Sequence, residues 1–516
     1  MRTAAGRRAV IPLRELLAGT PVLAVHGDPR TPIASLVLDS RAAAPGACFL
    51  ALPGTRADGA AFAADAVARG AAAVVAAADP DPALAGRAVW VRVADAVAAA
   101  AAVAANFHGR PFERLVLLGV TGTNGKTTTT WLLEAALAAA GHRPAVLGTI
   151  GVRYAGRTEP ATHTTPDAPA LHAVAARMVA AGVTHLAMEV SSHALALGRV
   201  TGLRFRGAAF TNLTQDHLDF HPTFEDYAAA KLRLFREHLA PDALAVVALD
   251  DPRADRFAEA ARTAGARVVR FSTRPGAAAD LAVERATYAA DGTRAALRCF
   301  GERIDAEIQT IGEHNLANFL TAVGLARAAG VALDVAVRGA AGVRNVPGRL
   351  ERVPVRAGID AFVDYSHTPD ALGHAVATLH PLCRGRLWVV FGCGGDRDRT
   401  KRPLMGRAAA AADRVIVTSD NPRTEDPEAI LDQIEPGLRE AGLARVALRE
   451  LGAAGRAYAR EPDRRAAIAA AVAQARPGDL ILVAGKGHED YQIVGREKRH
   501  FDDREEVRRA AAAPPA

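Results

Sequence analysis

Residues 119–130, GVTGTNGKTTTT, constrain the fold of this chain more than any other segment. An apolar run at 115–118 precedes them, and the helical pattern WLLEAALAAA follows them. A strand, a glycine-rich turn and a Lys-Thr pair that opens a helix form a phosphate-binding loop, because glycines let a phosphate approach the backbone N–H groups. The usual pattern begins with a small residue where this chain has Val120. The alternative is an ordinary glycine-rich turn between a strand and a helix.

The loop predicts that the chain binds a nucleoside triphosphate together with Mg²⁺. Lys126 can reach the β- and γ-phosphates, and the hydroxyl of Thr127 or Thr128 can bind the metal ion. The residues of this segment that we expect to contact the nucleotide are Gly122, Thr123, Asn124, Gly125, Lys126, Thr127 and Thr128.

The order of apolar runs predicts an α/β protein of three domains. Short strands alternate with Ala-rich helical segments over 1–110, which indicates a small N-terminal α/β domain. Residues 111–350 carry the phosphate loop and strands at 145–150, 184–190, 206–210 and 244–249, which predict a central mononucleotide-binding domain with a mainly parallel sheet. After the linker-like segment 345–349, residues 351–516 start with a hairpin and continue with strands at 387–391, 414–418 and 480–484. This pattern predicts a C-terminal Rossmann-like α/β domain with a ligand site at the carboxyl edge of its sheet.

Composition excludes several classes of protein. No segment approaches about 18 consecutive strongly apolar residues, so we expect no membrane span, and the N-terminus lacks the pattern of a signal peptide. The four cysteines have no paired spacing, which fits a reducing cytoplasm and indicates neither a disulfide framework nor a metal site. The net charge of +7 is spread over the chain with few aromatic residues, so we expect small anionic substrates and no nucleic acid.

Three further residues lie in a setting that suits the chemistry of ATP. Glu189 ends the strand THLAMEV, where an acid can hold Mg²⁺, although such a carboxylate can also cap the next helix. The loop 214–221 contains histidines that could bind a second cation or serve a structural role. Lys231 lies in the helical segment YAAAKLRLF, and its pattern alone is typical of a solvated lysine.

The motifs TGTNGKTT, EVSSHAL, NLTQDHLDFH, AKLRLF and GEHNLANFL together resemble those of the Mur ligases. These are ATP-dependent amide ligases of peptidoglycan precursor synthesis, and the wider group includes folylpolyglutamate synthase. With LDSR near the N-terminus and DNPR near the C-terminus, the chain is similar to the branch that adds a diamino acid to UDP-N-acetylmuramoyl-L-alanyl-D-glutamate. The motifs follow the order of the family along nearly the whole chain.

The resemblance implies roles for residues around the ATP site. It implies that Lys126, Lys231 and His217 are catalytic, that Lys231 is carbamylated, and that Thr127, Glu189, His217 and the modified Lys231 hold Mg²⁺. A carbamate is an anion, whereas a plain ammonium cannot bind a cation. His314, Asn315 and Asn318 match the motif that faces the nucleoside, although capping of the helix N-terminus is an alternative role. Arg349 matches an ATP-binding position, and Asp364, Tyr365 and His367 resemble elements of the domain junction.

The resemblance also implies where the two other substrates bind. The predicted contacts of the UDP-muramoyl dipeptide are Ser40, Thr164, Thr165, Ser191 and Arg199. Some relatives have Gln where this chain has Leu197, so we expect one polar contact to be absent.

DNPR resembles the form found in ligases that add meso-2,6-diaminopimelate. The distal end of this substrate is itself an amino acid, so an arginine and an amide can bind its carboxylate and an acid its ammonium. L-lysine has no distal carboxylate and would leave a buried Arg423 unpaired. The predicted diaminopimelate contacts are Arg397, Asp420, Asn421, Arg423, Gly485 and Glu489.

The expected reaction starts when the D-Glu carboxylate attacks the γ-phosphate of ATP and forms an acyl phosphate. The amine of the diamino acid then attacks the acyl carbon and releases phosphate. The expected protein is a cytoplasmic monomer whose third domain closes over the central one. Two other functions remain open, namely a sister ligase (lysine-adding, or a folylpolyglutamate synthase) and, from another class, a P-loop protein that uses nucleotide as a conformational switch.

Overall fold

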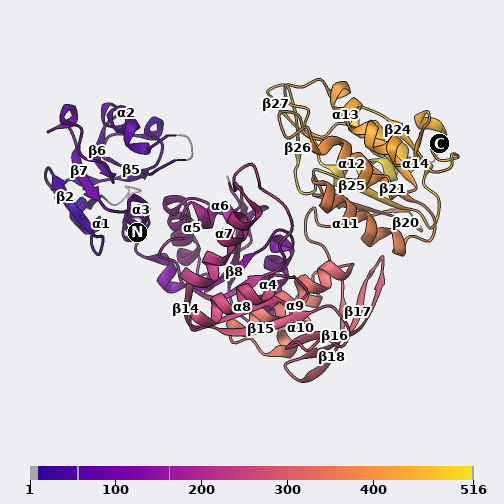
Figure 1. Cartoon of the computed structure of the whole chain (residues 1–516), viewed down its shortest axis with the longest axis horizontal. Helices are drawn as coiled ribbons and strands as arrows, with labels where there is room; N and C mark the ends of the chain where they lie inside the picture. Colours follow the sequence, from indigo (N-terminus) through magenta and orange to yellow (C-terminus); the bar gives the residue numbers. More distant parts are fainter. Residues whose placement is uncertain (1–9, 55–56, 162, 357, 514–516) are drawn as a thin grey trace. The chain divides into compact units, whose positions relative to one another are not determined.

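The structure, a computed structural model, describes residues 10–54, 57–161, 163–356 and 358–513. The predicted absence of a signal peptide concerns residues 1–9, which lie outside the described residues. The chain divides into two compact units, Met1–Ala282 with Ala317–Ala340, and Val283–Leu316 with Ala341–Ala516. Three large sheets, of five, eleven and seven strands, follow one another along the chain (Figure 1).

The first sheet has the strand order β2-β7-β6-β5-β4. Strands β4 to β7 are parallel, and β2 pairs with β7 in the antiparallel sense. Two clusters of buried side chains show that both faces of this sheet are covered. The elements are β1 (Ile11–Pro12), α1 (Leu13–Leu16), β2 (Val22–His26), β3 (Pro32–Ile33), β4 (Ser35–Val37), β5 (Ala47–Ala51), α2 (Ala63–Ala68), β6 (Ala71–Ala76), β7 (Val89–Val93) and α3 (Ala96–Phe107).

The central sheet has the order β11-β10-β9-β12-β8-β13-β14-β15-β16-β17-β18. The seven neighbouring strands β9, β12, β8, β13, β14, β15 and β16 are parallel, as predicted. Antiparallel strands extend the sheet at both ends. The strands are β8 (Val116–Thr121), β9 (Pro144–Gly148), β10 (Gly151–Tyr154), β11 (Arg157–Glu159), β12 (His185–Glu189), β13 (Phe205–Phe210), β14 (Leu239–Ala248), β15 (Arg267–Ser272), β16 (Leu281–Ala289), β17 (Gly292–Cys299) and β18 (Glu302–Ile308).

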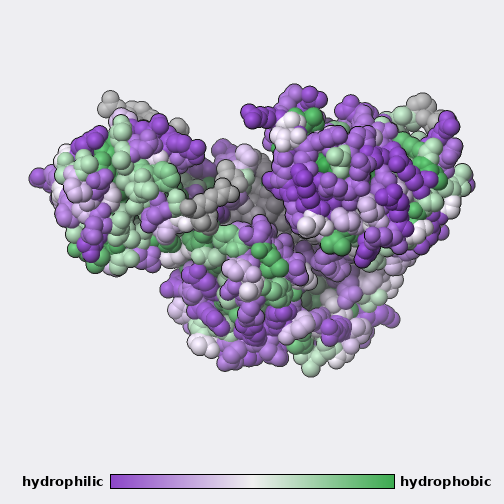
Figure 2. Space-filling model, turned by 45° about the horizontal axis from the view of Figure 1, so that its top comes forward, coloured by the Kyte–Doolittle hydropathy of each residue, from purple (hydrophilic) through white to green (hydrophobic). Residues whose placement is uncertain are grey.

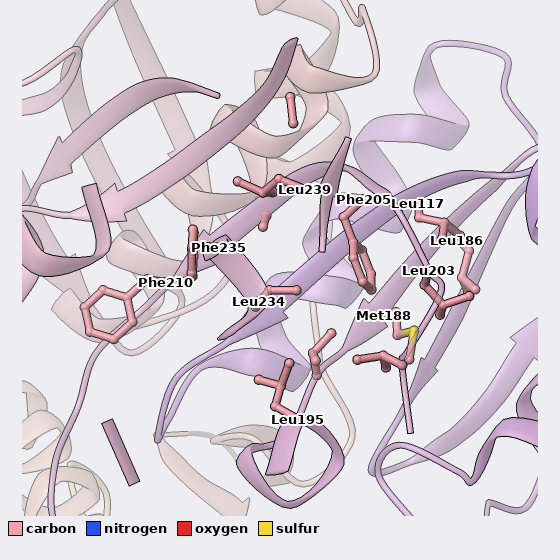
Figure 3. Close-up of a cluster of buried hydrophobic side chains, with 14 of the residues drawn as sticks. Leu117, Leu186, Met188, Leu195, Leu203, Phe205, Phe210, Leu234, Phe235 and Leu239 are labelled. Atoms are coloured by element: carbon pink, nitrogen blue, oxygen red, sulfur yellow. The ribbon is translucent and has the colours of Figure 1, made fainter. Parts of the chain in front are cut away.

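Helices cover both faces of the parallel strands. Leu117 of β8 lies in a cluster with side chains of β12, α5, α7 and α8, part of which Figure 3 shows. Its neighbour Leu118 points to the opposite face, where a Cβ added at Gly207 would lie 3.0 Å from Leu118 and 3.2 Å from Leu325 of α9. The helices are α4 (Lys126–Ala139), α5 (Ala168–Ala180), α6 (Ser192–Ala196), α7 (Phe224–Glu237), α8 (Ala254–Thr263), α9 (Glu313–Ala328) and α10 (Leu333–Ala341).

Several strands of the central sheet were not predicted. Strands β16 to β18 contain many charged residues, and the burial of β18 alternates between exposed and buried positions. Strands β10 and β11 are short and β11 is largely exposed. An apolar run marks a strand buried on both faces, whereas β11, β16 and β18 expose part of their residues to water and β10 is only four residues long.

The third sheet has the order β19-β20-β25-β21-β22-β24-β23 and begins with the predicted antiparallel hairpin. The later strands are parallel, and side chains of β21 alternate between two clusters. Helices α11 to α13 pack on one face, and α14 and α15 on the other. The bounds are β19 (Glu351–Arg356), β20 (Ile359–Asp364), α11 (Pro369–Leu379), β21 (Leu387–Phe391), α12 (Lys401–Ala409), β22 (Arg414–Val417), α13 (Pro427–Glu440), β23 (Ala444–Arg445), β24 (Ala457–Arg460), α14 (Arg464–Gln474), β25 (Leu480–Ala484), β26 (Tyr491–Val494), β27 (Glu497–His500) and α15 (Asp503–Ala512).

The surface carries hydrophobic residues only in small groups on the face that Figure 2 shows, and hydrophilic residues predominate there. Among the helices of the described residues, none is both long and apolar enough to cross a membrane.

Candidate functional site

The topology of the central sheet places the phosphate loop between two polar strand ends. Strand β8 lies between β12 and β13, and all three run in the same direction. Glu189 at the end of β12 is in register with Val120, and Phe210 at the end of β13 is in register with Thr121. Ligands of open α/β sheets bind at such a carboxyl edge.

The segment after β13 holds the loop in place. Asn212 accepts hydrogen bonds from the backbone N–H groups of Thr123 and Asn124, at 2.9 and 3.0 Å. The hydroxyl of Thr211 donates to the carbonyl of Asn124 at 2.6 Å. The segment after β13 therefore preorganises the phosphate loop.

Two glycines of the loop have no room for a side chain. Gly122 has φ +149°, and a Cβ there would lie 1.9 Å from the hydroxyl oxygen of Thr211. Gly125 immediately precedes α4 with φ +86°, and a Cβ there would lie 2.2 Å from Oδ1 of Asn318. Glycine is therefore required at both positions, and the N-terminus of α4 is left open for an anion.

Two lysines meet at one carbonyl of the loop. Nζ of Lys126 donates to the carbonyl oxygens of Gly122 and Thr123, both at 2.8 Å, and Nζ of Lys231 donates to that of Gly122 at 2.7 Å. Lys231 is 1% exposed, so the solvated position that its helical pattern indicated is wrong. Burial lowers the pKa of Lys231 well below its usual value, and the charge of Lys126 lowers it further.

Glu189 is buried beside the hydroxyl of Thr127. Oγ1 of Thr127 donates to Oε1 of Glu189 at 2.9 Å, and Thr149 donates to the same carboxylate through its N–H and its hydroxyl, at 2.9 and 3.1 Å. Ser191, and not Glu189, caps the following helix α6. A hydroxyl and a carboxylate supply the hard oxygen atoms that Mg²⁺ prefers, so this pair fits the metal.

His217 lies in the segment between β13 and α7, near Lys231. Its backbone is left-handed with φ +54°, its Nε2 is 3.5 Å from Oδ2 of Asp216, and its ring is 4.8 Å from that of His193. Burial lowers the pKa of His217, and Lys126 and Lys231 add to the effect against the opposing charge of Asp216. In the chain as far as it is described, no group of three or more His, Cys, Asp or Glu side chains could hold a metal.

Most of the predicted dipeptide contacts lie together beside Glu189. The hydroxyl of Thr165 donates to the carbonyl of Glu189 at 2.8 Å and accepts from the N–H of Ser191 at 3.2 Å. Arg199 donates to the carbonyl of Thr165 at 2.8 Å. Thr164 and Thr149 share a hydrogen bond of 3.0 Å between their hydroxyls. Ser40 begins a 3-10 turn, Ser40–Ala42, that lies between strands β4 and β5 of the first sheet.

The predicted nucleoside residues fall into both compact units. In the first unit, Asn318 contacts the phosphate loop and lies 3.4 Å from the hydroxyl of Thr129. In the second unit, Asn315 and Arg349 line a cavity of about 290 Å³. The ring of His314 lies 3.4 Å from the hydroxyl of Thr378. These residues therefore have tertiary contacts beyond capping of α9.

The DNPR run follows β22 at the carboxyl edge of the third sheet. The N–H of Ile493 and the side chain of Gln492, both in β26, donate to Asn421 Oδ1 and to the carbonyl of Asp420, at 2.9 and 2.7 Å. Arg423 has a left-handed backbone with φ +52°, and its guanidinium donates to the carbonyl of Gly395 at 2.7 Å. The run is therefore held in one conformation by β26 and by the loop after β21.

Glu489 completes this cluster with the segment after β25. Asn421 Nδ2 donates to Oε2 of Glu489 at 3.0 Å, so Asn421 and Glu489, which are far apart in the sequence, meet. A Cβ at Gly485 would lie 2.6 Å from Oδ2 of Asp420, so glycine is needed there for space. Arg397 is exposed and bonds to the carbonyl of Asp396. A Cβ added at Gly394 would lie 3.0 Å from the guanidinium of Arg423 and 3.7 Å from Cγ of Arg397, so both arginines lie beside Gly394.

Two buried arginines that support this edge were missed. Arg464 is 1% exposed and forms a bidentate ion pair with Asp503, with both distances 2.7 Å, while it also donates to the carbonyls of Ser419 and Ala484. Arg402 lies in the charged run DRDRTKRP yet is fully buried and pairs with Glu425. No local pattern indicates either ion pair, because each pair joins segments that are distant in the sequence.

Family models match consecutive parts of the chain. The Mur ligase family catalytic domain matches residues 32–108, the Mur ligase middle domain residues 120–326, and the Mur ligase glutamate ligase domain residues 348–487.

Curated relatives match nearly the full length. A UDP-N-acetylmuramoyl-L-alanyl-D-glutamate--2,6-diaminopimelate ligase of Gloeobacter violaceus is 46% identical over 503 residues, which cover 96% of this chain and 97% of that protein. The protein of the same name from Solibacter usitatus is 45% identical, with 92% of each chain covered.

Solved structures share the fold. A structure of a UDP-N-acetylmuramoyl-L-alanyl-D-glutamate--2,6-diaminopimelate ligase is 34% identical, with a TM-score of 0.69 and with 98% of this chain and 99% of that chain covered. MurF ligase from Thermotoga maritima in complex with ADP is 20% identical, with a TM-score of 0.57 and coverage of 88% and 94%.

Proposed function

We propose, because the chain belongs to the Mur ligase family, that it is the ATP-dependent ligase that joins meso-2,6-diaminopimelate to the D-glutamate of UDP-N-acetylmuramoyl-L-alanyl-D-glutamate. The names of the relatives at 45–46% identity support this substrate pair. The reaction forms one amide bond and contributes to the synthesis of the peptidoglycan precursor.

The observation that carries the proposal is the cluster of Asn421, Arg423 and Glu489. Asn421 touches Glu489 at 3.0 Å, and Arg423 is held by its contact with Gly395. An arginine and an amide suit a carboxylate, and an acid suits an ammonium, so the cluster fits the zwitterionic distal end of diaminopimelate. A lysine side chain would leave the arginine without its anion.

The phosphate loop binds ATP. The backbone N–H groups before α4 and the ammonium of Lys126 face the phosphates, and Lys126 leaves the carbonyls of Gly122 and Thr123 to reach the γ-phosphate. Asn318 lies against Gly125, at the end of the loop nearest the nucleoside. The loop therefore positions the phosphate for attack.

Thr165, Ser191 and Arg199 orient the dipeptide beside Glu189. The D-Glu side-chain carboxylate attacks the γ-phosphorus, the bond to the β–γ bridging oxygen breaks, and ADP leaves. The neutral amine of diaminopimelate then attacks the acyl phosphate carbon, phosphate departs, and the amine loses a proton. Catalysis comes mainly from positioning and from neutralisation of charge on the phosphates.

Thr127, Glu189, His217 and a carbamylated Lys231 would hold Mg²⁺. When bound, the ion neutralises charge on the triphosphate. Lys231 is suited to carbamylation because burial lowers its pKa and so favours the neutral amine, the form that adds CO₂ with loss of a proton. The carbamate keeps one N–H that can still donate to the carbonyl of Gly122, and its oxygens would be the metal ligands.

The proposed setting is the cytoplasm, where ATP and UDP-linked precursors are available. Four cysteines are free among the described residues, which fits a reducing compartment. We propose a monomer with domains at 1–110, 111–350 and 351–516.

Release of phosphate tests the function. Purified protein receives ATP, Mg²⁺ and the UDP-muramoyl dipeptide, with meso-diaminopimelate, L-lysine or no amino acid. The proposal predicts phosphate and a tripeptide product only with diaminopimelate, and a selective loss of that reaction in Arg423→Ala but not in Arg439→Ala, a change on the distant helix α13. Equal release with L-lysine would refute the role of Arg423. Hydrolysis that ignores both substrates would support a nucleotide switch.

A further inference from the structure

Lys486 is a fully buried cation inside the third-domain cluster that none of the assignments above uses. It is 0% exposed, and its Nζ lies 3.4 Å from Oδ1 of Asn421 and 3.4 Å from Oε2 of Glu489. Asn421 in turn donates to the same oxygen of Glu489. The three side chains therefore form a closed triangle at the base of the proposed substrate site.

A buried lysine is retained only where its charge is compensated. Lys486 has Glu489 as its ion-pair partner, and the ring of Tyr491 lies 5.4 Å from its ammonium. Because Lys486 is enclosed, it does not present its ammonium to a ligand directly. Its effect on a ligand comes through the charge it adds to the site and through the orientation of Asn421 and Glu489.

The charges of the cluster cancel. Asp420 and Glu489 are acids, and Arg423 and Lys486 are bases, so the four side chains sum to zero. The nearby Arg464 is balanced by its own partner Asp503. Arg397 is exposed, so water screens its charge. Without Lys486, the enclosed part of the site would carry one net negative charge.

A site without net charge suits a substrate whose distal end is also neutral overall. The distal end of diaminopimelate carries a carboxylate and an ammonium and is neutral overall, whereas the distal end of L-lysine is a lone cation. A neutral site favours the first, and a negative site favours the second, because unlike charges attract most strongly where water is excluded.

We propose that Lys486 determines the specificity of the site for a zwitterionic side chain over a cationic one. It acts as a positioning residue and as a fixed counter-charge to Glu489. The inference rests on the proposed function, since it concerns the choice between two amino-acid substrates of that reaction.

The test compares kcat and KM for meso-diaminopimelate and for L-lysine in wild type, Lys486→Met and Lys486→Arg. Lys486→Met should shift the ratio of the two kcat/KM values toward L-lysine by roughly tenfold or more, mainly through KM, while Lys486→Arg keeps the wild-type ratio. Lys486→Gln keeps a hydrogen-bond donor without the charge, and should shift the ratio as Lys486→Met does. Thermal unfolding shows which variants fold.

The possible results separate the two claims. A wild type that prefers diaminopimelate, with the same ratio in the folded uncharged variants, overturns the role of Lys486 alone. A parallel loss for both amino acids overturns it too, because a purely structural role lowers both. A wild type that joins neither amino acid refutes the proposed function and this inference with it.

Discussion

The ammonium groups of Lys126 and Lys231 both donate to the carbonyl oxygen of Gly122, so two like charges meet at one acceptor. Such an arrangement is unfavourable unless one group is neutral, and burial lowers the pKa of Lys231 in that direction. An enclosed amine whose neutral form is favoured is chemically suited to carbamylation. At the scale of the residue, Lys231 is thus the centre of the proposed ATP site.

Replacement of Lys231 tests this view. Lys231→Ala should lower the ligation rate roughly 100-fold or more, because the variant cannot form the proposed carbamate that would help to hold Mg²⁺. Arg236→Ala, an exposed change on the same helix, should leave the rate unchanged. In parallel, ¹³C-labelled bicarbonate should give a carbamate NMR signal in wild type that is missing in Lys231→Ala. An unchanged rate, or a signal that persists in the variant, would contradict the account.

The sequence predicts the identity of these residues better than their surroundings. The position of Lys231 came from the resemblance to a family, whereas the pattern of its helix indicated exposure. Local pattern shows which face of a helix is apolar but not which polar side chain a neighbouring loop encloses. The buried Arg402 was missed for the same reason, because its partner Glu425 comes from another segment.

At the scale of the element, the phosphate loop depends on two closely packed glycines, Gly122 and Gly125, and on hydrogen bonds from the segment after β13. Gly125 touches Asn318, whereas Gly141, after the other end of α4, also has a positive φ of +79° but has no heavy atom near its side-chain position. A substitution at Gly125 therefore tests a steric requirement, whereas a substitution at Gly141 tests only a conformational one.

Alanine at these two positions should give different results. Gly125→Ala should weaken ATP binding by roughly tenfold or more, because the new methyl group displaces Asn318 and the loop. Gly141→Ala should keep the ATP affinity and cost only about 1 kcal/mol in stability, from the left-handed backbone. Titration with a fluorescent ATP analogue and thermal unfolding measure both. Equal ATP affinities in the two variants would contradict the steric role of Gly125.

The carboxyl edge of the third sheet depends on Arg464. Its guanidinium joins Asp503 to the ends of β22 and β25, in a site closed to water. Removal of one partner leaves a buried charge, so Arg464→Ala should destabilise this part of the chain by about 3–5 kcal/mol. Arg499→Ala, which removes an exposed pair with Glu497, should leave the unfolding temperature unchanged. Similar unfolding temperatures for the two variants would show that the buried pair is dispensable.

Strands that are buried on both faces, such as β8, β21 and β25, were predicted because their residues are almost continuously apolar. Strands β16 to β18 were not, because water on one face lets charged residues alternate with buried ones. The continuously apolar strands of the sheets could thus be predicted, while many strands toward the ends of the sheets could not.

At the scale of the whole molecule, buried histidines make stability depend on pH. Burial is the main cause that lowers the pKa of five histidines from 6.5 to about 4, namely His108, His172, His185, His193 and His488. Between pH 6.5 and 4 the unfolded chain therefore binds more protons than the folded one. Stability rises with pH wherever the unfolded state binds more protons, so acid should destabilise the protein in this window.

Thermal unfolding from pH 7.5 to pH 4.5 measures the effect. The unfolding temperature should fall as pH falls through this range, and His172→Leu should make the fall less steep. His26→Leu, on the exposed end of β2, serves as the matched control and should keep the wild-type slope. A slope in His172→Leu equal to that of wild type would show that this histidine does not contribute.

At the scale of the whole molecule, the proposed reaction also needs two substrate sites. An ATP site on the central sheet and an amino-acid site on the third sheet are both needed for a ligase, whereas a nucleotide switch needs only the first. The direct measurement is a competition in one tube, with ATP, Mg²⁺, the UDP-muramoyl dipeptide and equal concentrations of meso-diaminopimelate and L-lysine, followed by mass spectrometry of the UDP-linked product. The account predicts the diaminopimelate tripeptide alone, and only when ATP is present. A lysine tripeptide, or consumption of ATP without any new UDP-linked product, would contradict it.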